Sequence, residues 1–432
     1  MKADLLIHSA AQLITCASPH GPKRGAAMRD VGVIENGAVA MLGDRLLAIG
    51  KTDDIRSNYR ATKEMGASGQ VVCPGFVDPH THLVFAGDRV NEWELKLRGA
   101  SYLDILAAGG GILSTMRATR EATLEQLVAS ARKRLDVMLR HGVTTCEIKT
   151  GYGLNVESEL KMLQAIEALA QTHPCDVLLT LLAAHTVPPE FRNADFVNVD
   201  DYVDVVVDEI IPQAAAWFER EARANHASPM SCDVFCEKNA FDVAQARRVL
   251  IAGKQHGMRP KIHVDQFNSL GGIEMALELG ALSCDHLDVT TVEDRARLAQ
   301  SSAVAVVLSA VNFHLGGIGF ANARAMIDER CAVALSTDMN PGSAPCLSPQ
   351  LVMAIACRFQ KLSPAEALNA CTINAAHALG IGDAVGSLEV GKQADVLIVD
   401  APDYRHLAYQ FGGNLVQTVI KRGRVIDLES RL

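Results

Sequence analysis

The sequence lacks the features that mark membrane proteins and disulfide-stabilised secreted proteins. No stretch of its 432 residues approaches the roughly 20 apolar residues that a membrane-spanning helix needs. The eleven cysteines include no CxxC pair and lie within apolar stretches, which is typical of reduced, buried thiols in a cytosolic protein. We therefore expect a protein without membrane contact and without disulfide bonds.

Positive charge is also in deficit, because 41 lysines and arginines face 50 aspartates and glutamates and leave a formal net charge of −9. This balance argues against a nucleic-acid-binding surface and favours a small-molecule substrate. The first residues, MKADLLIHSAAQLITC, do not form a secretory signal, because Asp4, His8 and Gln12 interrupt the apolar run. We expect this segment to be a strand and the protein to be cytoplasmic.

Hydrophobic residues are abundant, at 49% against 21% charged residues, which is enough to build a large core. Residues 1–71 and 384–432 alternate short strand-like runs with Gly and Asn turns, a pattern typical of small all-β units. The sequence thus predicts a β-sandwich domain built from both termini, with a second domain, residues 72–383, inserted between them.

The inserted domain contains eight short apolar runs that alternate with amphipathic helical segments such as residues 123–142. The runs span residues 71–82, 142–153, 177–186, 232–241, 260–267, 282–289, 303–315 and 333–343. Eight such units predict an α/β fold, a (β/α)8 TIM barrel with its active site at the C-terminal ends of parallel strands. A doubly wound open sheet is the alternative. Almost every run ends in or near His, Asp, Glu, Lys or Tyr, however, and a barrel brings all strand ends to one place.

Histidine and aspartate at four of these strand ends form a candidate metal site. His80 and His82 alternate along an extended segment, so both imidazoles point to the same side. The other members, in the fifth, sixth and eighth runs, are His263, His286 and Asp338. Such a set suits Zn(II) or Fe(II), and an open coordination position lets a bound water ionise near neutral pH. A structural role explains a single HxH pair more readily than it explains the whole set.

The segments PGFVDPHTH, KIHVDQF, CDHLDV and STDMNPGS resemble the amidohydrolase superfamily, and the resemblance covers nearly the whole chain. Its members carry a metal-dependent hydrolase site in a barrel beside a β-sandwich. The resemblance implies that the metal ligands are His80, His82, His263 and Asp338. It also implies that Asp338 accepts a proton from the attacking water. His286 would lie beside that water, where an imidazole can orient it, polarise the carbonyl or pass a proton to the leaving nitrogen.

Superfamily members with two metals use a carboxylated lysine at the end of the fourth strand. The fourth run of this chain contains Glu237 and Lys238, so a lysine is nearby but follows an acidic residue. We therefore expect one Zn(II) or Fe ion per chain. Both metals accept these ligands, and the native ion depends partly on metal availability.

Six segments resemble a narrower family, the imidazolonepropionases: HTHLVFAGDRVNEWELKLRG, AAGGGILSTMRATR, IKTGYGL, LAAHTVPPEF, HVDQFNSLGG and STDMNPGSAP. This resemblance implies hydrolysis of the ring amide of 4-imidazolone-5-propanoate to N-formimidoyl-L-glutamate, in histidine degradation, by a homodimer. It places substrate contacts at Arg89, Tyr152, His185, Asn340, Gly342 and Ser343, and Gln266 is a further candidate for binding the ring.

The chemistry of these residues suits a flat ring with a carboxylate tail. Arg89 offers the tail a charge-assisted fork, and Tyr152 and His185 offer the ring directional hydrogen bonds. Simpler roles stay open, because Arg89 can pair with Asp88 or Glu92, Tyr152 can pack at the barrel rim and His185 can order its loop.

Gln266 and Asn340 also have two interpretations each. An amide has no useful basicity, so Gln266, where some family members carry Glu, cannot be a general base. It either binds the ring or fixes loop geometry. The sequence Asn340-Pro341-Gly342 forms a plausible turn by composition alone.

The glycine run Gly109–Gly111, followed by Ser114, Thr115 and Arg117, lacks the GK[ST] ending of a phosphate-binding loop. A lid over the substrate is the better interpretation, because three glycines tolerate conformational change and closure would exclude water.

Two other functions stay open. An aminohydrolase acting on a related heterocycle would use the same metal site and release ammonia. A catalytically silent barrel serving as a scaffold would be purified without metal.

Overall fold

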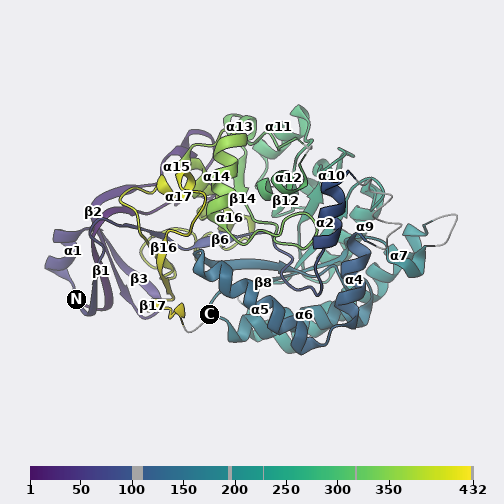
Figure 1. Ribbon diagram of the computed structural model, residues 1–432, viewed down its shortest axis with the longest axis horizontal. Coiled ribbons are helices and arrows are strands. Elements are labelled where there is room, and N and C mark those ends of the chain that lie inside the picture. Colours follow the sequence, from purple (N-terminus) through teal and green to yellow (C-terminus); the bar gives the residue numbers. More distant parts are fainter. Residues whose placement is uncertain (100–109, 193–196, 227, 317–318, 430–432) are drawn as a thin grey trace.

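The computed structural model describes residues 1–99, 110–192, 197–226, 228–316 and 319–429. Figure 1 shows a sheet from the two ends of the chain at one side and a helix-wrapped barrel beside it. This arrangement confirms the predicted α/β barrel with a second, smaller unit made from both termini. The exact boundaries at 71/72 and 383/384 stay a prediction.

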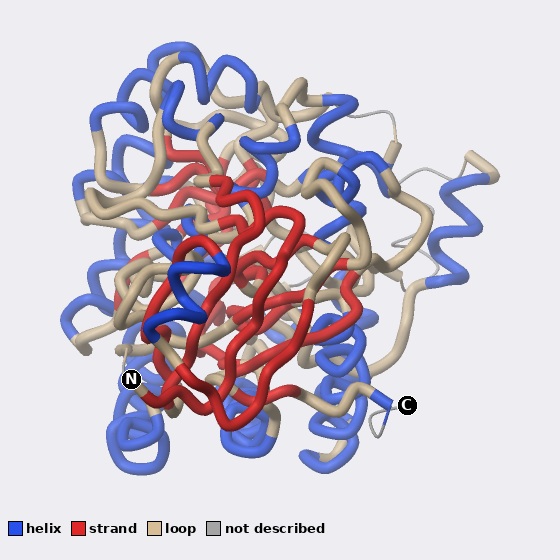
Figure 2. The backbone as a smooth tube through the Cα atoms, turned by 90° about the vertical axis from the view of Figure 1, so that its left-hand side faces the viewer, coloured by secondary structure: helices blue, strands red, loops and turns tan. Residues whose placement is uncertain are grey.

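The terminal sheet is mixed and has the strand order β17-β16-β15-β5-β1-β2-β3, with β4 paired to β1. Figure 2 shows this sheet facing the viewer, in red. Its strands are β1 Lys2–Ile14, β2 Val33–Leu42, β3 Arg45–Lys51, β4 Arg60–Gly66, β5 Val71–Pro74, β15 Val396–Val399, β16 Val416–Lys421 and β17 Arg424–Val425. β1 serves both halves of the sheet, because β4 runs parallel to its first residues and β5 to its last. Ser9, at φ 59°, lies at the irregularity where β1 bends between Ile7 and Ala10.

The barrel strands follow the order β14-β13-β12-β11-β9-β8-β7-β6, and each neighbouring pair is parallel. They are β6 Phe76–Asp78, β7 Val143–Lys149, β8 Asp176–Ala184, β9 Ser231–Cys236, β11 Ile262–Val264, β12 Ser283–His286, β13 Val304–Val307 and β14 Ala332–Leu335, with β10 Arg259–Pro260 beside β9. A bridge between Thr81 and Met339 brings the first and last strands together, so the barrel is nearly closed. Each of the eight predicted runs overlaps a barrel strand, although the first run also supplies β5 of the terminal sheet.

Helices cover the outside of the barrel. They include α2 Val90–Leu97, α4 Ile112–Glu121, α5 Leu124–Arg140, α6 Val156–Thr172, α7 Val199–Val205, α8 Ile211–Trp217, α9 Val243–Gln255, α10 Gly272–Glu278, α11 Val292–Gln300, α12 Ser309–Leu315, α13 Ala323–Asp328, α14 Pro349–Phe359, α15 Pro364–Ala370 and α16 Ile373–Ala378; α1 Thr52–Asn58 and α17 His406–Tyr409 lie outside this ring. The segment predicted to be helical over 123–142 is α5. Its start is fixed by a capping box in which Thr123 and Gln126 each bind the backbone N–H of the other.

The high content of hydrophobic residues is accounted for by the buried core. Every residue of β13 and β14 is buried, as expected for parallel strands that are covered on both faces. All eleven cysteines are free, in agreement with the predicted absence of disulfides. Within the described ranges, no helix has both the length and the apolar character to cross a membrane.

Candidate active site

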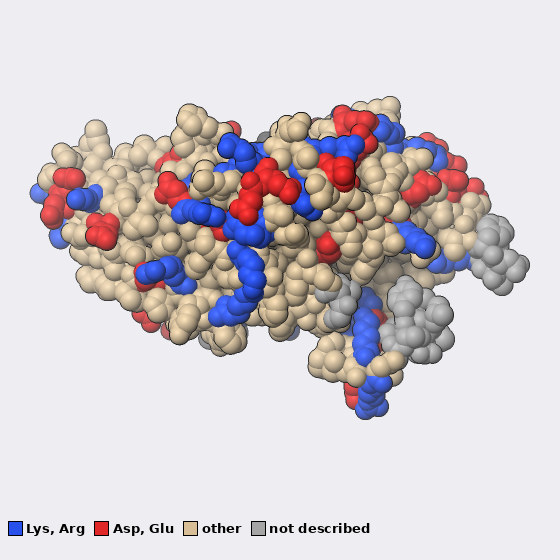
Figure 3. All heavy atoms as spheres, turned by 90° about the horizontal axis from the view of Figure 1, so that it is seen from above, with Lys and Arg blue, Asp and Glu red and all other residues tan. Residues whose placement is uncertain are grey.

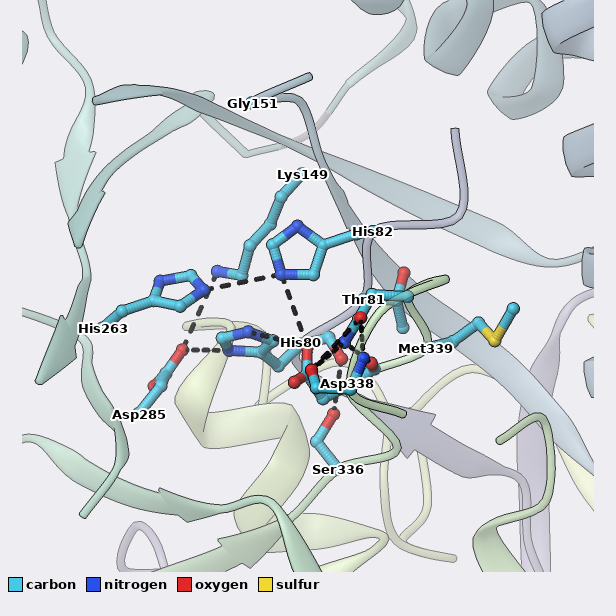
Figure 4. A network of polar contacts seen from close by, with 12 residues as sticks. His80, Thr81, His82, Lys149, Gly151, His263, Asp285, Ser336, Asp338 and Met339 are labelled. Atoms are coloured by element: carbon cyan, nitrogen blue, oxygen red, sulfur yellow. Dashed lines mark hydrogen bonds and ion pairs between the residues drawn. The ribbon is translucent and has the colours of Figure 1, made fainter. Parts of the chain in front are cut away.

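Three imidazoles and one carboxylate meet at the C-terminal ends of the barrel strands (Figure 4). Asp338 Oδ1 lies 3.4 Å from Nε2 of His80 and 3.4 Å from Nε2 of His82. Nε2 of His263 lies 3.5 Å from Nε2 of His82. The structure therefore brings together all four residues predicted to bind the metal, although they come from three separate strand ends.

Two buried carboxylates contact the Nδ1 atoms of His80 and His263, on the side of each ring away from the cluster. Asp285 Oδ2 accepts a hydrogen bond of 2.7 Å from His80 Nδ1, and Asp233 Oδ2 lies 3.0 Å from His263 Nδ1. A carboxylate beside Nδ1 favours the tautomer that carries its proton there. The lone pair of Nε2 in His80 and His263 then faces the centre of the cluster.

The residues present fit a divalent metal ion. Zinc bonds of about 2.0–2.1 Å in tetrahedral geometry separate neighbouring ligand atoms by about 3.4 Å, which matches the distances above. Within the described residues, His80 Nε2 and Asp338 Oδ1 are buried without a hydrogen-bond partner. Buried polar atoms are normally satisfied, and a cation at this point would satisfy both. The groupings His80–His82–Asp338 and His80–His263–His286 each place three ligand atoms close together.

The charges of Asp338, His82 and His263 also suit a cation, whereas His80 differs from them. Burial would raise the pKa of Asp338, but contacts with His80 and His82 hold it well below its ordinary value, so the carboxylate is ionised. Burial lowers the pKa of His82 to about 4 and also lowers the pKa of His263. Burial acts on His80 in the same direction, but its contacts with Asp285 and Asp338 outweigh it and raise the pKa.

His286 lies against the cluster at the end of β12, with its ring centroid 5.3 Å from that of His263. Burial holds the pKa of His286 well below its ordinary value, so the ring is neutral. His286 and Asp338 both have positive φ, at 84° and 50°. Such conformations cost energy in residues other than glycine and cluster at functional sites.

A cavity opens above the cluster. Apart from His80, which lies beneath the other rings, every residue predicted to form the site lines this cavity. Its wall also contains residues that the sequence analysis did not single out, namely Lys96, Ile112, Phe235, Phe267, Leu315 and Gly316.

Arg89, the N-cap of α2, lies on the cavity wall in an ion pair. Its Nε donates a hydrogen bond of 2.8 Å to Glu92, and Nη2 bonds the other carboxylate oxygen. Glu92 also accepts from the backbone N–H of Gly111 and from Lys96. The pairing that we considered as a simpler role is thus present, but it leaves Nη1 against Gly342, where any side chain would clash with the guanidinium.

Tyr152 and His185 pack over the ligands. The rings of His82 and His185 are stacked, with centroids 5.2 Å apart, and Tyr152 contacts both rings. His185 Nδ1 lies 3.1 Å from the carbonyl oxygen of Gly151, so one ring nitrogen orders the loop. Burial lowers the pKa of His185 and raises the pKa of Tyr152, and both side chains are therefore neutral.

The loop after β14 is organised by Asn340. Its amide nitrogen donates to the carbonyl of Asp338, and its oxygen accepts from the backbone N–H groups of Gly342 and Ser343, each at 2.8 Å. The turn expected from composition is therefore present, and it leaves the backbone at 342–343 against Arg89. Gln266 is buried and also lines the cavity.

Two other predictions concern flanking loops. Glu237 binds the backbone N–H groups of Phe267 and Asn268, and Lys238 is exposed, so within the described residues neither lies among the ligand atoms. Gly109 of the predicted lid lies outside the described residues, while Gly111 is bonded to Glu92.

Sequence reasoning missed a layer of buried charges beneath the ligands. It consists of Glu147, Lys149, Asp233, Lys261 and Asp285, all essentially inaccessible to solvent. A signal was available, because Lys261 precedes His263 by two residues and Glu147 precedes Lys149 by two. Residues two apart on a barrel strand face the same interior.

Comparison with known proteins agrees with the site. The amidohydrolase family model matches residues 242–426. An imidazolonepropionase of Chloroflexus aggregans is 55% identical over 98% of both chains, and one of Herpetosiphon aurantiacus is 47% identical over 98% of this chain and 97% of its own.

Solved structures share the fold at low sequence identity. An adenosine deaminase from Xanthomonas campestris with bound zinc superposes with a TM-score of 0.68 at 21% identity, over 100% of this chain and 96% of the other. A triazine hydrolase variant gives 0.74 at 17% identity, over 99% and 97%. By the full-length similarities to curated relatives, the chain belongs to the imidazolonepropionase family of amidohydrolases.

Proposed function

We propose that this protein hydrolyses the ring amide of 4-imidazolone-5-propanoate to N-formimidoyl-L-glutamate, a step of histidine degradation. The observation that carries the proposal is the cluster of three Nε2 atoms and Asp338 Oδ1 at the floor of a cavity with Arg89 on its wall. The names of the full-length relatives support the same reaction.

One zinc or iron ion per chain would be held by His80, His82, His263 and Asp338. When bound, such an ion acidifies water and polarises a carbonyl oxygen. The solved relatives that carry zinc support this choice of metal, and iron accepts the same ligands.

Asp338 and His286 are the residues that we assign to proton transfer. Asp338 is ionised and lies at the cluster, so its carboxylate can accept the proton of the attacking water. His286 is neutral and buried, and it can orient the water, hydrogen-bond the developing oxyanion and deliver a proton to the ring nitrogen as the amide bond breaks.

The remaining cavity residues would orient the substrate. Glu92 pairs with Nε and Nη2 of Arg89, so Nη1 stays available on the cavity side. Nη1 would bind the propanoate tail. The ring would lie between the aromatic wall and the amide wall, in contact with Tyr152, His185, Gln266, Asn340, Gly342 and Ser343. These neutral groups hydrogen-bond a flat heterocycle without adding charge.

A deaminase of a related heterocycle is the alternative. The solved deaminases share the fold, but fold alone does not fix the reaction. Gln266 supplies an amide on the cavity wall, where a glutamate could have served an aminohydrolase as proton shuttle, and an amide cannot take that role.

The setting of the enzyme is part of the same proposal: a cytoplasmic homodimer that binds a small molecule and no nucleic acid. Figure 3 shows Lys and Arg interspersed with Asp and Glu over the displayed face, in keeping with the net charge of −9. Mixed charge of this kind does not attract a polyanion. Sedimentation of the purified protein at the mass of one chain would contradict the dimer.

The test is incubation of metal-loaded protein with freshly generated 4-imidazolone-5-propanoate. We expect loss of its ultraviolet absorbance and matching formation of N-formimidoyl-L-glutamate. The proposal is wrong if metal-loaded, folded protein leaves the substrate to decay at the uncatalysed rate.

A further inference from the structure

The buried charges beneath the ligand cluster converge on Lys149, the last residue of β7. Its Nζ lies 2.7 Å from Asp233 Oδ2, 2.8 Å from Glu147 Oε2 and 3.7 Å from Asp285 Oδ2. The side chain has no solvent exposure. Figure 4 shows its end beside the ring of His263, above Asp285.

Two of these carboxylates continue to the ligand imidazoles. Asp233 lies 3.0 Å from His263 Nδ1, and Asp285 accepts from His80 Nδ1 at 2.7 Å. One ammonium group therefore joins two carboxylate–imidazole pairs. The first pair joins β9 to β11, and the second joins β12 to the segment after β6. Each pair ends in an Nε2 atom of the ligand cluster.

Both carboxylates have Lys149 as a positive partner inside the barrel. Lys149 Nζ lies 2.7 Å from Asp233 Oδ2 and 3.7 Å from Asp285 Oδ2, and all three side chains are inaccessible to solvent. A buried charge that loses its partner is strongly destabilised where it stands. Without the ammonium, Asp233 and Asp285 would therefore no longer be held in their present positions.

We propose that Lys149 is a positioning residue for the metal site: it holds Asp233 and Asp285 in place, and through them the rings of His263 and His80. The role depends on distance and connectivity. Outer-shell partners of metal ligands typically change metal affinity by about 10- to 100-fold when they are removed. The inference rests on the metal site of the proposed function but not on its substrate.

The neighbouring lysine, Lys261, shares the contact with Asp285 but has no contact with Asp233 among the described ion pairs. Lys261 Nζ is satisfied by Glu147 at 2.9 Å and by the carbonyl oxygen of Pro79 at 2.8 Å, and it lies 3.8 Å from Asp285. Among the described ion pairs, Lys149 is the lysine that contacts both Asp233 and Asp285.

Lys421 provides a matched control. It is also buried, at 3% side-chain exposure, and pairs with Asp395 at 2.7 Å and Asp176 at 2.8 Å. Asp176 begins β8, at the opposite end of the barrel from the ligand cluster. Lys421→Met therefore removes a buried lysine with two carboxylate partners while leaving the ligand shell intact.

The experiment measures zinc affinity by competition with a chelator, on apoprotein of the full chain that is shown to be folded by circular dichroism. We expect Lys149→Met to raise the dissociation constant for zinc about tenfold or more. The visible absorption spectrum of the cobalt-loaded variant should also change. Lys421→Met should lower the melting temperature and leave zinc affinity within about twofold of the wild type.

Unchanged zinc affinity in folded Lys149→Met overturns the proposal, and so does an equal loss in Lys421→Met. If Lys149→Met does not fold, Lys149→Gln is measured instead, because it keeps a donor but removes the charge. That variant supports the proposal only if zinc binding weakens. No substrate enters the assay, so a wild type that binds zinc tightly but does not hydrolyse imidazolone propanoate would overturn the proposed function and leave this inference standing.

Discussion

Replacing Arg89 by methionine tests how the cavity recognises a carboxylate tail. Methionine keeps most of the length of the side chain but removes the guanidinium. Glu92 then loses one partner but keeps its bonds to Lys96 and to the backbone of Gly111, so the start of α2 should remain in place. The change therefore acts mainly on the substrate.

The magnitude follows from how much of the guanidinium is free. Nε and Nη2 of Arg89 are committed to Glu92, which leaves Nη1 for one charge-assisted hydrogen bond. Such bonds contribute about 1.5–3 kcal/mol, equivalent to about a 10- to 150-fold change in binding. Because the tail lies away from the ring amide, KM should rise by this factor while kcat changes little.

The assay is steady-state hydrolysis of imidazolone propanoate followed by its ultraviolet absorbance. Arg98→Met is the matched control. Arg98 lies just beyond the end of α2, is exposed and pairs with Glu94. We expect its KM to equal that of the wild type. An unchanged KM in Arg89→Met would assign the carboxylate to another cation, and Lys96 also lines this cavity.

Three further outcomes are expected. His286→Ala should abolish turnover while metal content, measured by elemental analysis, stays at that of the wild type; retained turnover would remove His286 from the mechanism. Chelation of the metal should abolish activity, and added zinc or iron should restore it; full activity of demonstrably metal-free protein would contradict the site. Asp288→Asn should stabilise the protein at neutral and higher pH. Burial raises the pKa of Asp288 to about 7, whereas an unfolded aspartate titrates near 3.9. Wild-type stability therefore falls as pH rises from about 4 to 7, and the melting temperature of the variant should exceed that of the wild type at pH 8 and match it near pH 4. An equal difference at both pH values would refute this assignment.

The fold was predictable because the sequence patterns of its strands and of its helices are both local. Strands buried on both faces appear as apolar runs. The N-terminus of α5 is marked in the sequence by the capping box of Thr123 and Gln126. The division of residues 71–78 between two sheets was not predictable, since β5 and β6 form one continuous apolar run in sequence. Only the pairing of β5 with β1 and β15 assigns it to the terminal sheet.

The site was predictable as far as its chemistry is carried by residues at strand ends. That rule brings His80, His82, His263, His286 and Asp338 together as candidates, and the resemblance to the amidohydrolases selects four of them as ligands. The layer of buried charges beneath these ligands could not be predicted from the sequence. A lysine is ordinarily exposed, and only the pairing between distant strands shows that Lys149 and Lys261 are buried. The bond between Arg89 and Glu92 was considered, but sequence could not show that it leaves Nη1 against the loop at Gly342.

Hydrolysis in water labelled with oxygen-18 tests the central claim most directly. The account predicts that each turnover consumes one 4-imidazolone-5-propanoate, releases no ammonia and yields N-formimidoyl-L-glutamate with one labelled oxygen in the newly formed carboxylate. Stoichiometric release of ammonia with the ring intact, or a product without label in that carboxylate, would contradict attack of water on the ring amide at this metal centre.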